Sequence, residues 1–433
     1  MVCRYNVDVT LLSSADFAAE REVFKEKFLK GIFDLATSRA STSLPRILYI
    51  DHTAKLGGGE IALLHLVQHL NRARFVPVVV LGEDGPLRAK LEASGVETHI
   101  LALSPSVTET RKDGLGLSTL LRLRDVAAAG RYVLALRKFI RTQNAAVVHT
   151  NSLKSDILGG AAARLAGVPL LWHVRDRIDS DYLPGPVAAA FRRLCRFLPA
   201  RVVANSHSTL ETITLGEALP RMGVVHDGVL PHPAPALSKP TAPHTPTIGL
   251  VGRIARWKGQ HVFLNAAALV HTRFPKAQFQ IIGAPLFAEQ AYEEEIRVLT
   301  RELGLEGCVE FLGFRTDVPA LIDGLDILAH ASITAEPFGL VIAEGMAAGK
   351  PVVATNGGGA REIVTDGETG LLVPMGDAEA MASALVQLLE DPEQARRMGE
   401  RGRERVAAQF SIERTARGLE AVYDDILQAP RTR

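Results

Sequence analysis

The stretch that decides the fold is Glu336-Pro-Phe-Gly-Leu-Val-Ile-Ala-Glu344, which runs directly into Gly345-Met-Ala-Ala-Gly-Lys-Pro-Val-Val-Ala354. A Pro-Phe-Gly turn opens a predicted helix, and the apolar segment Pro351 to Ala354 is a predicted strand. Glu336 falls in the loop before the helix and Glu344 in its second turn, so both carboxylates can reach a ligand at the helix N-terminus. That terminus presents N–H groups and a positive dipole end, which suit a phosphate. A diphosphate on the N–H groups, with one acid for a ribose and one for a sugar, makes a nucleotide-sugar site.

Four further segments of the C-terminal half support this interpretation. Together with the two-acid stretch they resemble the retaining glycosyltransferases of family 4, which have the two-Rossmann GT-B fold. The segments resemble, in order, the first strand and phosphate loop, the next core strand, the loop that holds the base and a glycine turn of that family. They are Thr247-Ile-Gly-Leu-Val-Gly-Arg-Ile-Ala-Arg-Trp-Lys-Gly259, Phe279-Gln-Ile-Ile-Gly283, Val309-Glu-Phe-Leu-Gly-Phe-Arg315 and Gly357-Gly-Gly-Ala-Arg-Glu362.

The resemblance implies roles for the charged residues of this half. Arg253 and Lys258 match the cations that hold the donor's diphosphate, and a planar guanidinium beside a point charge suits that group. Glu344 matches the acid that binds the ribose, and Glu336 matches the acid that contacts the donor sugar.

Backbone groups and glycines complete the implied donor site. Backbone N–H groups of Phe338, Gly339 and Leu340 are expected to contact sugar and phosphate, and Phe314 and Arg315 fall where the family's backbone reads the base. In the N-terminal half, Gly57, Gly58 and Gly59 match the family's glycine loop, where a side chain would block the donor.

His173 ends a predicted strand in Leu171-Trp-His-Val-Arg-Asp176 and resembles a family histidine that faces the transferred sugar. The plainer alternative is a strand-end histidine with a structural bond, and His149, at the end of the preceding strand, is a rival. Asp176 and Asn205-Ser206 are weaker candidates on the acceptor side.

The order of elements predicts two α/β domains with doubly wound parallel sheets. Residues 45–230 are expected to form a Rossmann-like acceptor domain, and residues 247–411 a Rossmann-like nucleotide-sugar domain. Between them, the proline-rich residues 231–246 predict an extended linker. The final helix, within residues 412–433, is expected from the resemblance to pack back on the first domain. Residues 1–44 are an N-terminal extension, in which apolar residues at helical spacing predict a helix packed on the first domain or, alternatively, a docking or membrane-surface helix.

Composition limits the class of protein. The chain has 433 residues, which is long enough for two hydrophobic cores. Its net charge of +1 gives no overall basic field that would attract nucleic acid. Cys3, Cys195 and Cys308 are scattered, which argues against a disulfide framework or a structural zinc and for a reducing compartment. With no apolar run long enough to span a membrane and no secretory leader pattern, we expect a cytoplasmic protein.

Two other patterns suggest metal chemistry only weakly. Asp179-Ser-Asp181 has the Asp-x-Asp form by which a different glycosyltransferase fold binds a metal, but three residues of that form are common by chance. His65 and His69 are spaced as in a zinc protease, yet Leu66 stands where the catalytic glutamate is required. We therefore expect no metal and no cofactor other than the nucleotide-sugar substrate.

The sequence as a whole favours a retaining glycosyltransferase that moves a sugar from a nucleoside diphosphate to an acceptor hydroxyl of a glycan, a lipid or a small molecule. A sugar-nucleotide epimerase of the same fold and a non-catalytic nucleotide-sugar-binding protein are the alternatives. Arg192, Arg193 and Arg196 alternate with apolar residues on a predicted helix, which is usually a solvated face but also suits an anionic membrane surface. Donor, acceptor, linkage and oligomeric state are open at this point.

Overall fold

The structure is a computed structural model that describes residues 43–104, 123–180, 183–217, 219–232, 245–285 and 289–429. The chain divides into two units, residues 1–44 and residues 45–433. The predicted helix of the N-terminal extension and most of the proline-rich linker lie outside the described residues. The second unit contains two parallel sheets and confirms the predicted fold class.

The first sheet has seven parallel strands in the order β3-β2-β1-β4-β5-β6-β7. Its strands are β1 (Arg46–Asp51), β2 (Val76–Leu81), β3 (Glu97–Ile100), β4 (Ala145–Thr150), β5 (Leu170–Val174), β6 (Arg201–Ala204) and β7 (Met222–Val224). The helices between them are α2 (Gly58–His69), α3 (Pro86–Ala93), α6 (Leu123–Thr142), α7 (Leu153–Ala166), α8 (Gly185–Cys195) and α9 (His207–Thr214).

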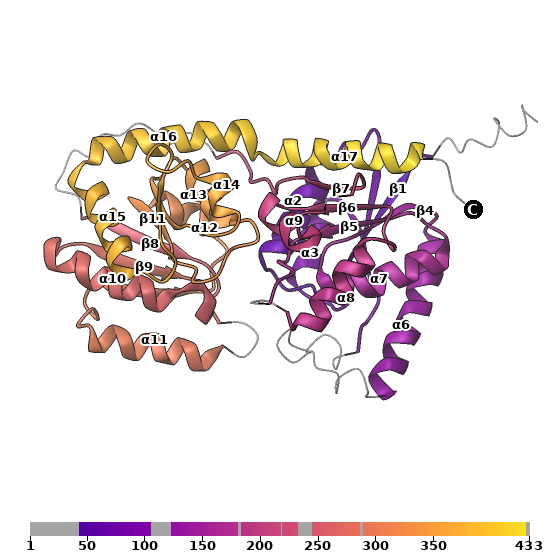
Figure 1. Ribbon diagram of the computed structural model, residues 1–433, viewed down its shortest axis with the longest axis horizontal. Helices are drawn as coiled ribbons and strands as arrows, with labels where there is room; N and C mark the ends of the chain where they lie inside the picture. Colours follow the sequence, from indigo (N-terminus) through magenta and orange to yellow (C-terminus); the bar gives the residue numbers. More distant parts are fainter. Residues whose placement is uncertain are drawn as a thin grey trace, which may run out of the picture. The chain divides into compact units, whose positions relative to one another are not determined.

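Both faces of this sheet are buried, which explains why its strands are almost continuously apolar. Successive side chains of a strand point to opposite faces. Leu48 and Ile50 accordingly join the core under α7 and α8, whereas Ile47 and Tyr49 join the core under α2. Figure 1 shows these helices on either side of the strands.

The second sheet has six parallel strands in the order β10-β9-β8-β11-β12-β13. Its strands are β8 (Thr247–Val251), β9 (Gln278–Ile282), β10 (Val309–Gly313), β11 (Ile327–His330), β12 (Val352–Thr355) and β13 (Leu371–Val373). Its helical segments are η2 (Arg256–Lys258), α10 (Gln260–Arg273), α11 (Gln290–Glu302), α12 (Val318–Asp323), α13 (Leu340–Ala347), α14 (Ala360–Ile363), α15 (Ala378–Glu390) and α16 (Pro392–Gln409).

The order of the strands in each sheet indicates where a ligand site is expected. In each sheet the chain reverses its direction of winding next to the first strand, between β1 and β4 and between β8 and β11. Open α/β sheets bind ligands beyond the carboxyl ends of strands at such a point. The loop after β8 carries Arg253 and Lys258, and the loop after β11 carries Glu336.

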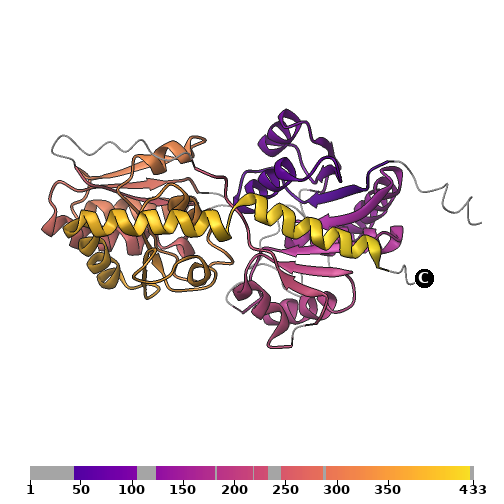
Figure 2. The same ribbon diagram turned by 90° about the horizontal axis from the view of Figure 1, so that it is seen from above.

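The last helix, α17 (Ile412–Gln428), belongs to the first sheet although it follows the second sheet in sequence. Figures 1 and 2 show it continuing from α16 and lying along the first domain. The buried Tyr423 places its hydroxyl 2.9 Å from that of Tyr49 in β1, and the Asn71 N–H donates to Glu420 at 2.8 Å. The helix thereby packs into the core that Ile47 and Tyr49 line.

Two local features differ from the sequence-based expectation. The short strand β7 was not predicted, because it has only three residues and the glycine at its centre weakens a strand pattern. The helix after the glycine loop begins at Gly58, so two of the three glycines lie in its first turn and Gly57 is its N-cap. None of the helices in the described part of the chain combines the length and apolar character that crossing a bilayer requires.

Candidate functional site

Glu336 lies at the centre of a buried polar cluster beyond the carboxyl end of β11. Its Oε1 forms an ion pair with the Lys258 ammonium and accepts a hydrogen bond from the Ser332 hydroxyl at 2.7 Å. His330 Nε2 lies 3.1 Å from the same oxygen, and Thr355 holds the other ring nitrogen at 3.3 Å. Only 4% of Glu336 is exposed, so the chain fixes this carboxylate before any ligand arrives.

The charge of Glu336 is secured by its partners. Burial on its own would raise its pKa, but Lys258 and His330 outweigh that effect and hold the pKa of Glu336 well below its usual range. The carboxylate is therefore ionised across the physiological range, and it can act as a hydrogen-bond acceptor for sugar hydroxyls.

A glycine turn holds the backbone on either side of Glu336. Gly359 N–H donates to the Glu336 carbonyl at 2.9 Å, and Gly358 lies so close that an added Cβ would be 2.0 Å from the same oxygen. Gly358 also has a φ of +63°, which favours glycine. The predicted glycine turn thus has a structural reason, which is to seat the two-acid loop.

The loop after β8 presents its cations beside the same loop. Lys258 Nζ lies 4.3 Å from the centre of the Trp257 ring and Arg253 Cζ lies 5.9 Å from it, so one indole lies near both cations. Gly259, which ends η2 and caps α10, has a φ of +71°, and an added Cβ would lie 1.9 Å from the Ala331 carbonyl oxygen. Only glycine permits this close approach of the cation loop to the loop after β11.

Glu344 lies in the second turn of α13, as the sequence predicts. It is half-buried, and no hydrogen-bond partner for its side chain exists among the described residues. Burial raises the pKa of Glu344 to about 7. The ionised form of a carboxylate placed in this way is stabilised by a ligand that donates hydrogen bonds to it.

The first turn of α13 lies between Glu336 and Glu344. Gly339 caps it with a φ of +108°, and Leu340 is its first helical residue. The Phe338 side chain is buried against His226 and Phe410, so its backbone is the part that remains for a ligand. These positions agree with the predicted backbone contacts, which stay predictions.

The glycine loop of the first domain faces this helix terminus. A Cβ added to Gly58 would lie 3.6 Å from Leu340 Cδ1 and one added to Gly59 would lie 3.8 Å from Arg175 Cδ. The space beside Gly57 is occupied by Glu60 of the same helix, whose carboxylate accepts a hydrogen bond from the Gly57 N–H at 3.1 Å. The two regions that the sequence assigns to the donor therefore meet.

His173 is fully buried at the end of β5 and joins its rival, His149. His173 Nδ1 lies 3.2 Å from His149 Nε2 and 3.4 Å from Arg175 Nη2, and His149 Nδ1 lies 2.7 Å from the Tyr423 hydroxyl. Burial, followed by the Arg175 charge, lowers the pKa of both rings well below the usual range, so both are neutral. His173 Nε2 is buried without a hydrogen-bond partner among the described residues.

Arg175, which follows β5, is a central residue that was not predicted from the sequence. It forms an ion pair with the buried Asp227 and donates through Nε to Asn151 Oδ1 at 3.0 Å. Asn151 in turn donates to Asp51 at 2.8 Å and to the Gly59 carbonyl at 3.2 Å. The feature of the sequence that could have identified Arg175 is its position at the end of a predicted strand, close to His173.

The side chains of other predicted residues are exposed or engaged in contacts within the protein. The Phe314 side chain is exposed, and Arg315 forms an exposed pair with Asp317 at 2.6 Å. Ser206 caps α9 and also donates to the Pro337 carbonyl at 2.5 Å, which ties the first domain to the Pro-Phe-Gly turn. Asn205 donates to Asp227 at 3.1 Å.

The two patterns that suggested metal chemistry are engaged in ordinary contacts. Asp179 pairs with Arg177, whereas Asp181 lies outside the described residues. His69 Nδ1 lies 2.9 Å from the His65 carbonyl oxygen within the same helix. Neither pattern forms a group of metal ligands within the described ranges.

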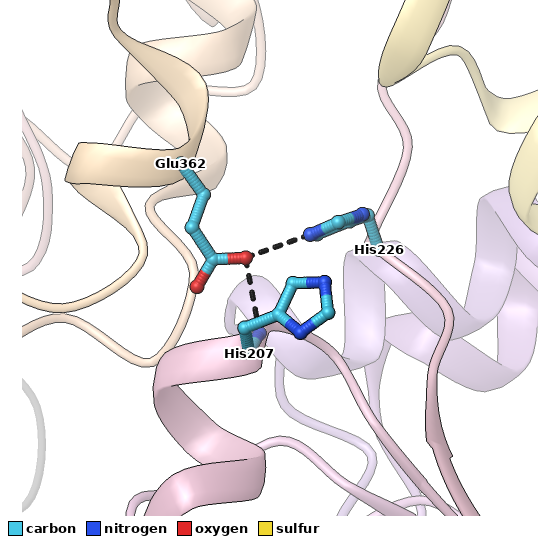
Figure 3. Close-up of side chains that lie close together, drawn as sticks. All are labelled: His207, His226 and Glu362. Atoms are coloured by element: carbon cyan, nitrogen blue, oxygen red, sulfur yellow. Dashed lines mark hydrogen bonds and ion pairs between the residues drawn. The ribbon is translucent and has the colours of Figure 1, made fainter.

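Glu362 of the glycine turn also joins the two domains. Its carboxylate accepts hydrogen bonds from the His207 and Ser208 N–H groups at 3.0 and 2.8 Å, and it pairs with His226 Nε2 at 2.7 Å. Figure 3 shows His207, His226 and Glu362 close together, with the Glu362 carboxylate bonded to the His226 ring and to the His207 backbone N–H. Sequence reasoning did not connect them, because 155 positions separate His207 from Glu362.

Two family descriptions match this chain in sequence order. The family described as Glycosyl transferase 4-like domain matches residues 57–228, and Glycosyl transferases group 1 matches residues 238–405. A D-inositol 3-phosphate glycosyltransferase of Corynebacterium urealyticum is 38% identical over 187 residues, which is 42% of this chain and 44% of that protein. The putative glycosyltransferase EpsD of Bacillus subtilis is 37% identical over 166 residues, 38% of this chain and 42% of that protein. The chain thus spans less than half the length of these curated relatives.

Solved structures match over a longer part of the chain. HepE of Anabaena, crystallised with UDP and glucose, has a TM-score of 0.74 and 26% identity over 88% of this chain and 100% of its own. A sucrose-phosphate synthase from Thermosynechococcus elongatus has a TM-score of 0.72 and 22% identity over 89% of this chain and 100% of its own, and shares the fold. With two matching family descriptions in sequence order and the same two-sheet architecture, the chain belongs to the family-4-type glycosyltransferases with the GT-B fold.

Proposed function

We propose that this protein is a retaining glycosyltransferase that moves a sugar from a nucleoside diphosphate to an acceptor hydroxyl. The observation that carries the proposal is the convergence of Lys258, Glu336 and the N-terminus of α13, with Glu344 one turn further along. These groups match the parts of a nucleotide sugar: positive charge for the diphosphate, and carboxylates for the sugar and ribose hydroxyls.

The proposed chemistry depends on stabilising the departing diphosphate. In the free protein Lys258 is paired with Glu336, so donor binding would move the ammonium toward the phosphate and leave Glu336 with Ser332 and His330. Arg253 and the N–H groups of α13 would add to the positive charge. Donors that are fixed before the reaction stabilise a developing negative charge more effectively than water does.

For the sugar, the proposed partners are Glu336 and His173. The unpartnered Nε2 of His173 is the atom of that ring left for a ligand, and the neutral ring can donate or accept one hydrogen bond. Retention of configuration is part of the proposal and rests on the resemblance to family 4. The acceptor hydroxyl would attack from the side on which the diphosphate leaves, with a phosphate oxygen taking its proton.

We infer a uridine diphosphate hexose as the first donor to test. Its support is HepE, whose solved structures hold UDP, glucose or UDP-glucose. The acceptor is proposed only as a hydroxyl group, since the relatives include an inositol phosphate glycosyltransferase and LpsE of Rhizobium meliloti, which is named for lipopolysaccharide core biosynthesis. We propose that no metal ion is needed, because Arg253 and Lys258 supply the charge that a metal would supply.

The protein is also proposed to work in the cytoplasm and to contact the inner membrane surface through the end of α8. Phe197 and Leu215 are 74% and 68% exposed, and Arg193 beside them is exposed as well. Exposed apolar side chains next to cations suit an anionic lipid surface. Co-sedimentation with phosphatidylglycerol vesicles, lost in Phe197→Asp and absent with phosphatidylcholine, tests this part.

The experiment for the main proposal is a donor screen. Thermal unfolding is measured with UDP-glucose, UDP-galactose, UDP-N-acetylglucosamine and GDP-mannose, and release of the nucleoside diphosphate is followed with candidate acceptors. A glycosyltransferase gives stabilisation by at least one donor and acceptor-dependent release. An epimerase instead changes the sugar of the donor without an acceptor, and a binding protein is stabilised but converts nothing.

A further inference from the structure

Three metal-ligand side chains that lie outside the proposed donor site gather at the boundary between the domains. His207 begins α9, His226 follows β7, and Glu362 lies in α14 of the second domain. One donor atom from each lies within 4.8 Å of the other two. Figure 3 shows both imidazole rings beside the carboxylate.

The surrounding contacts hold two of these ligands in place. The His226 ring lies 5.3 Å from the ring of Phe410, and its backbone carbonyl accepts from Thr415 at 2.8 Å. Glu362 is fixed by the N–H groups at the start of α9. The side chains of His226 and Glu362 are 27% and 18% exposed, so an ion can enter from solvent.

The third ligand is adjustable. His207 is exposed, and its ring nitrogens make no hydrogen bond to any described residue. Two donors on a tetrahedral zinc stand about 3.3 Å apart, given metal–ligand bonds of about 2.0–2.2 Å. The 2.7 Å contact between His226 and Glu362 would therefore open by about 0.6 Å, and the His207 ring would turn inward.

We propose that His207, His226 and Glu362 form a binding site for a divalent transition metal, Zn²⁺ in the first instance, that bridges the two domains. Two imidazole nitrogens and one carboxylate leave a fourth position for water, a ligand set that suits Zn²⁺ and not Mg²⁺ or Ca²⁺, which prefer oxygen. Because the ligands come from both domains, the ion holds the α9 terminus against α14. It is a clamp and has no part in the transfer chemistry.

The test uses full-length protein without a histidine tag, stripped of metal and titrated with Zn²⁺ in a calorimeter. We expect one ion per chain. His207→Ala, His226→Ala and Glu362→Gln should each weaken binding by more than about tenfold, since even outer-shell changes cost that much in metal sites. Co²⁺ should give a visible absorption band of tetrahedral form in the wild type and not in these three variants, and excess Mg²⁺ should not displace the zinc.

The matched control is the double variant His65→Ala, His69→Ala, which removes two other histidines of the first domain and should bind zinc as the wild type does. His207→Ala alters an exposed side chain, so it tests the site even if His226→Ala fails to fold. Absence of zinc binding by the wild type at micromolar concentration, or unchanged binding by His207→Ala and Glu362→Gln, would overturn the proposal. These readouts are independent of transfer activity.

Discussion

Lys258 and Glu336, which are 78 positions apart, form a partly buried ion pair between the loop after β8 and the loop after β11. The Glu336 carboxylate is the buried partner, and an unpaired buried charge costs several kcal/mol. The pairing thus keeps Glu336 ionised in the free protein. It also means that a diphosphate has to compete with Glu336 for the ammonium.

The first prediction concerns the cations. Arg253→Ala and Lys258→Ala should each lower turnover about a hundredfold to a thousandfold, because each removes a preorganised donor where negative charge develops. Steady-state kinetics at saturating donor measures this effect. Both residues serve one diphosphate, so the double variant should lose less than the product of the two single effects.

Arg256→Ala is the matched control for the cation loop. Arg256 is exposed and pairs with Glu295 on α11, so its loss should leave turnover within about twofold of the wild type. Wild-type turnover in Lys258→Ala at saturating donor would contradict the proposed role of Lys258.

The second prediction concerns the pH dependence of donor binding. Burial raises the pKa of Glu344 to about 7 in the free protein, and ribose hydroxyls bind the ionised form better. Donor affinity should therefore be stronger at pH 8 than at pH 6. Calorimetry with the intact nucleotide sugar measures it, and Glu344→Gln should bind weakly at both values with no such trend.

The same raised pKa predicts the sign of a stability effect. The folded free protein holds the Glu344 proton more tightly than the unfolded chain, in which a glutamate has its ordinary pKa of 4.5. The contribution of this group to the free energy of unfolding should therefore fall as pH rises from about 4.5 to about 7. Glu344→Gln should remove that contribution, and an unchanged pH profile of urea unfolding would exclude it.

The third prediction is that transfer does not require a divalent metal. Protein treated with a chelator should keep its turnover, since the cations of the β8 loop are proposed to neutralise the diphosphate. Complete loss in the chelator with recovery in manganese would contradict this and direct attention to Asp179 and Asp181. A small change of turnover that only Zn²⁺ produces would instead be assigned to the proposed metal site of His207, His226 and Glu362.

The fourth prediction concerns the buried chain Tyr49, Tyr423, His149 and His173, which links α17 to the end of β5. Tyr423→Phe removes a hydroxyl that contacts both Tyr49 and His149, and each lost buried hydrogen bond should cost about 1 kcal/mol. Urea unfolding measures the loss. If the chain also orients His173, turnover should fall in Tyr423→Phe and not in Tyr292→Phe, whose hydroxyl contacts His261 instead.

Much of the fold could be predicted from the sequence because its signals are local. Buried parallel strands such as Val76–Leu81 are continuous apolar runs, and the predicted helix after the Pro-Phe-Gly turn begins at Leu340. The strand β7 was not predicted because three residues around a glycine are too short to show a strand pattern. The helix start at Gly58 escaped because glycine gives no helical signal.

The site could be predicted less fully than the fold. Two short motifs contain the charged residues of the predicted donor site, namely Arg253 with Lys258 and Glu336 with Glu344. Because the members of each motif are close in sequence, their closeness in space could be predicted. The partners of these residues could not, because His330, Ser332 and Arg175 act through contacts that only the folded sheets create. The group at Glu362 combines residues of both domains for the same reason.

The measurement that bears most directly on the proposed function is proton NMR of the newly formed glycosidic linkage, recorded early in the reaction with the best donor of the screen. A retaining transferase that uses an α-linked nucleotide sugar gives an α-linked product, identified for a glucose, galactose or N-acetylglucosamine unit by the small coupling constant of its anomeric proton, and for a mannose unit by the one-bond C1–H1 coupling. A β-linked product would contradict the proposed mechanism and the roles assigned to Glu336 and Lys258.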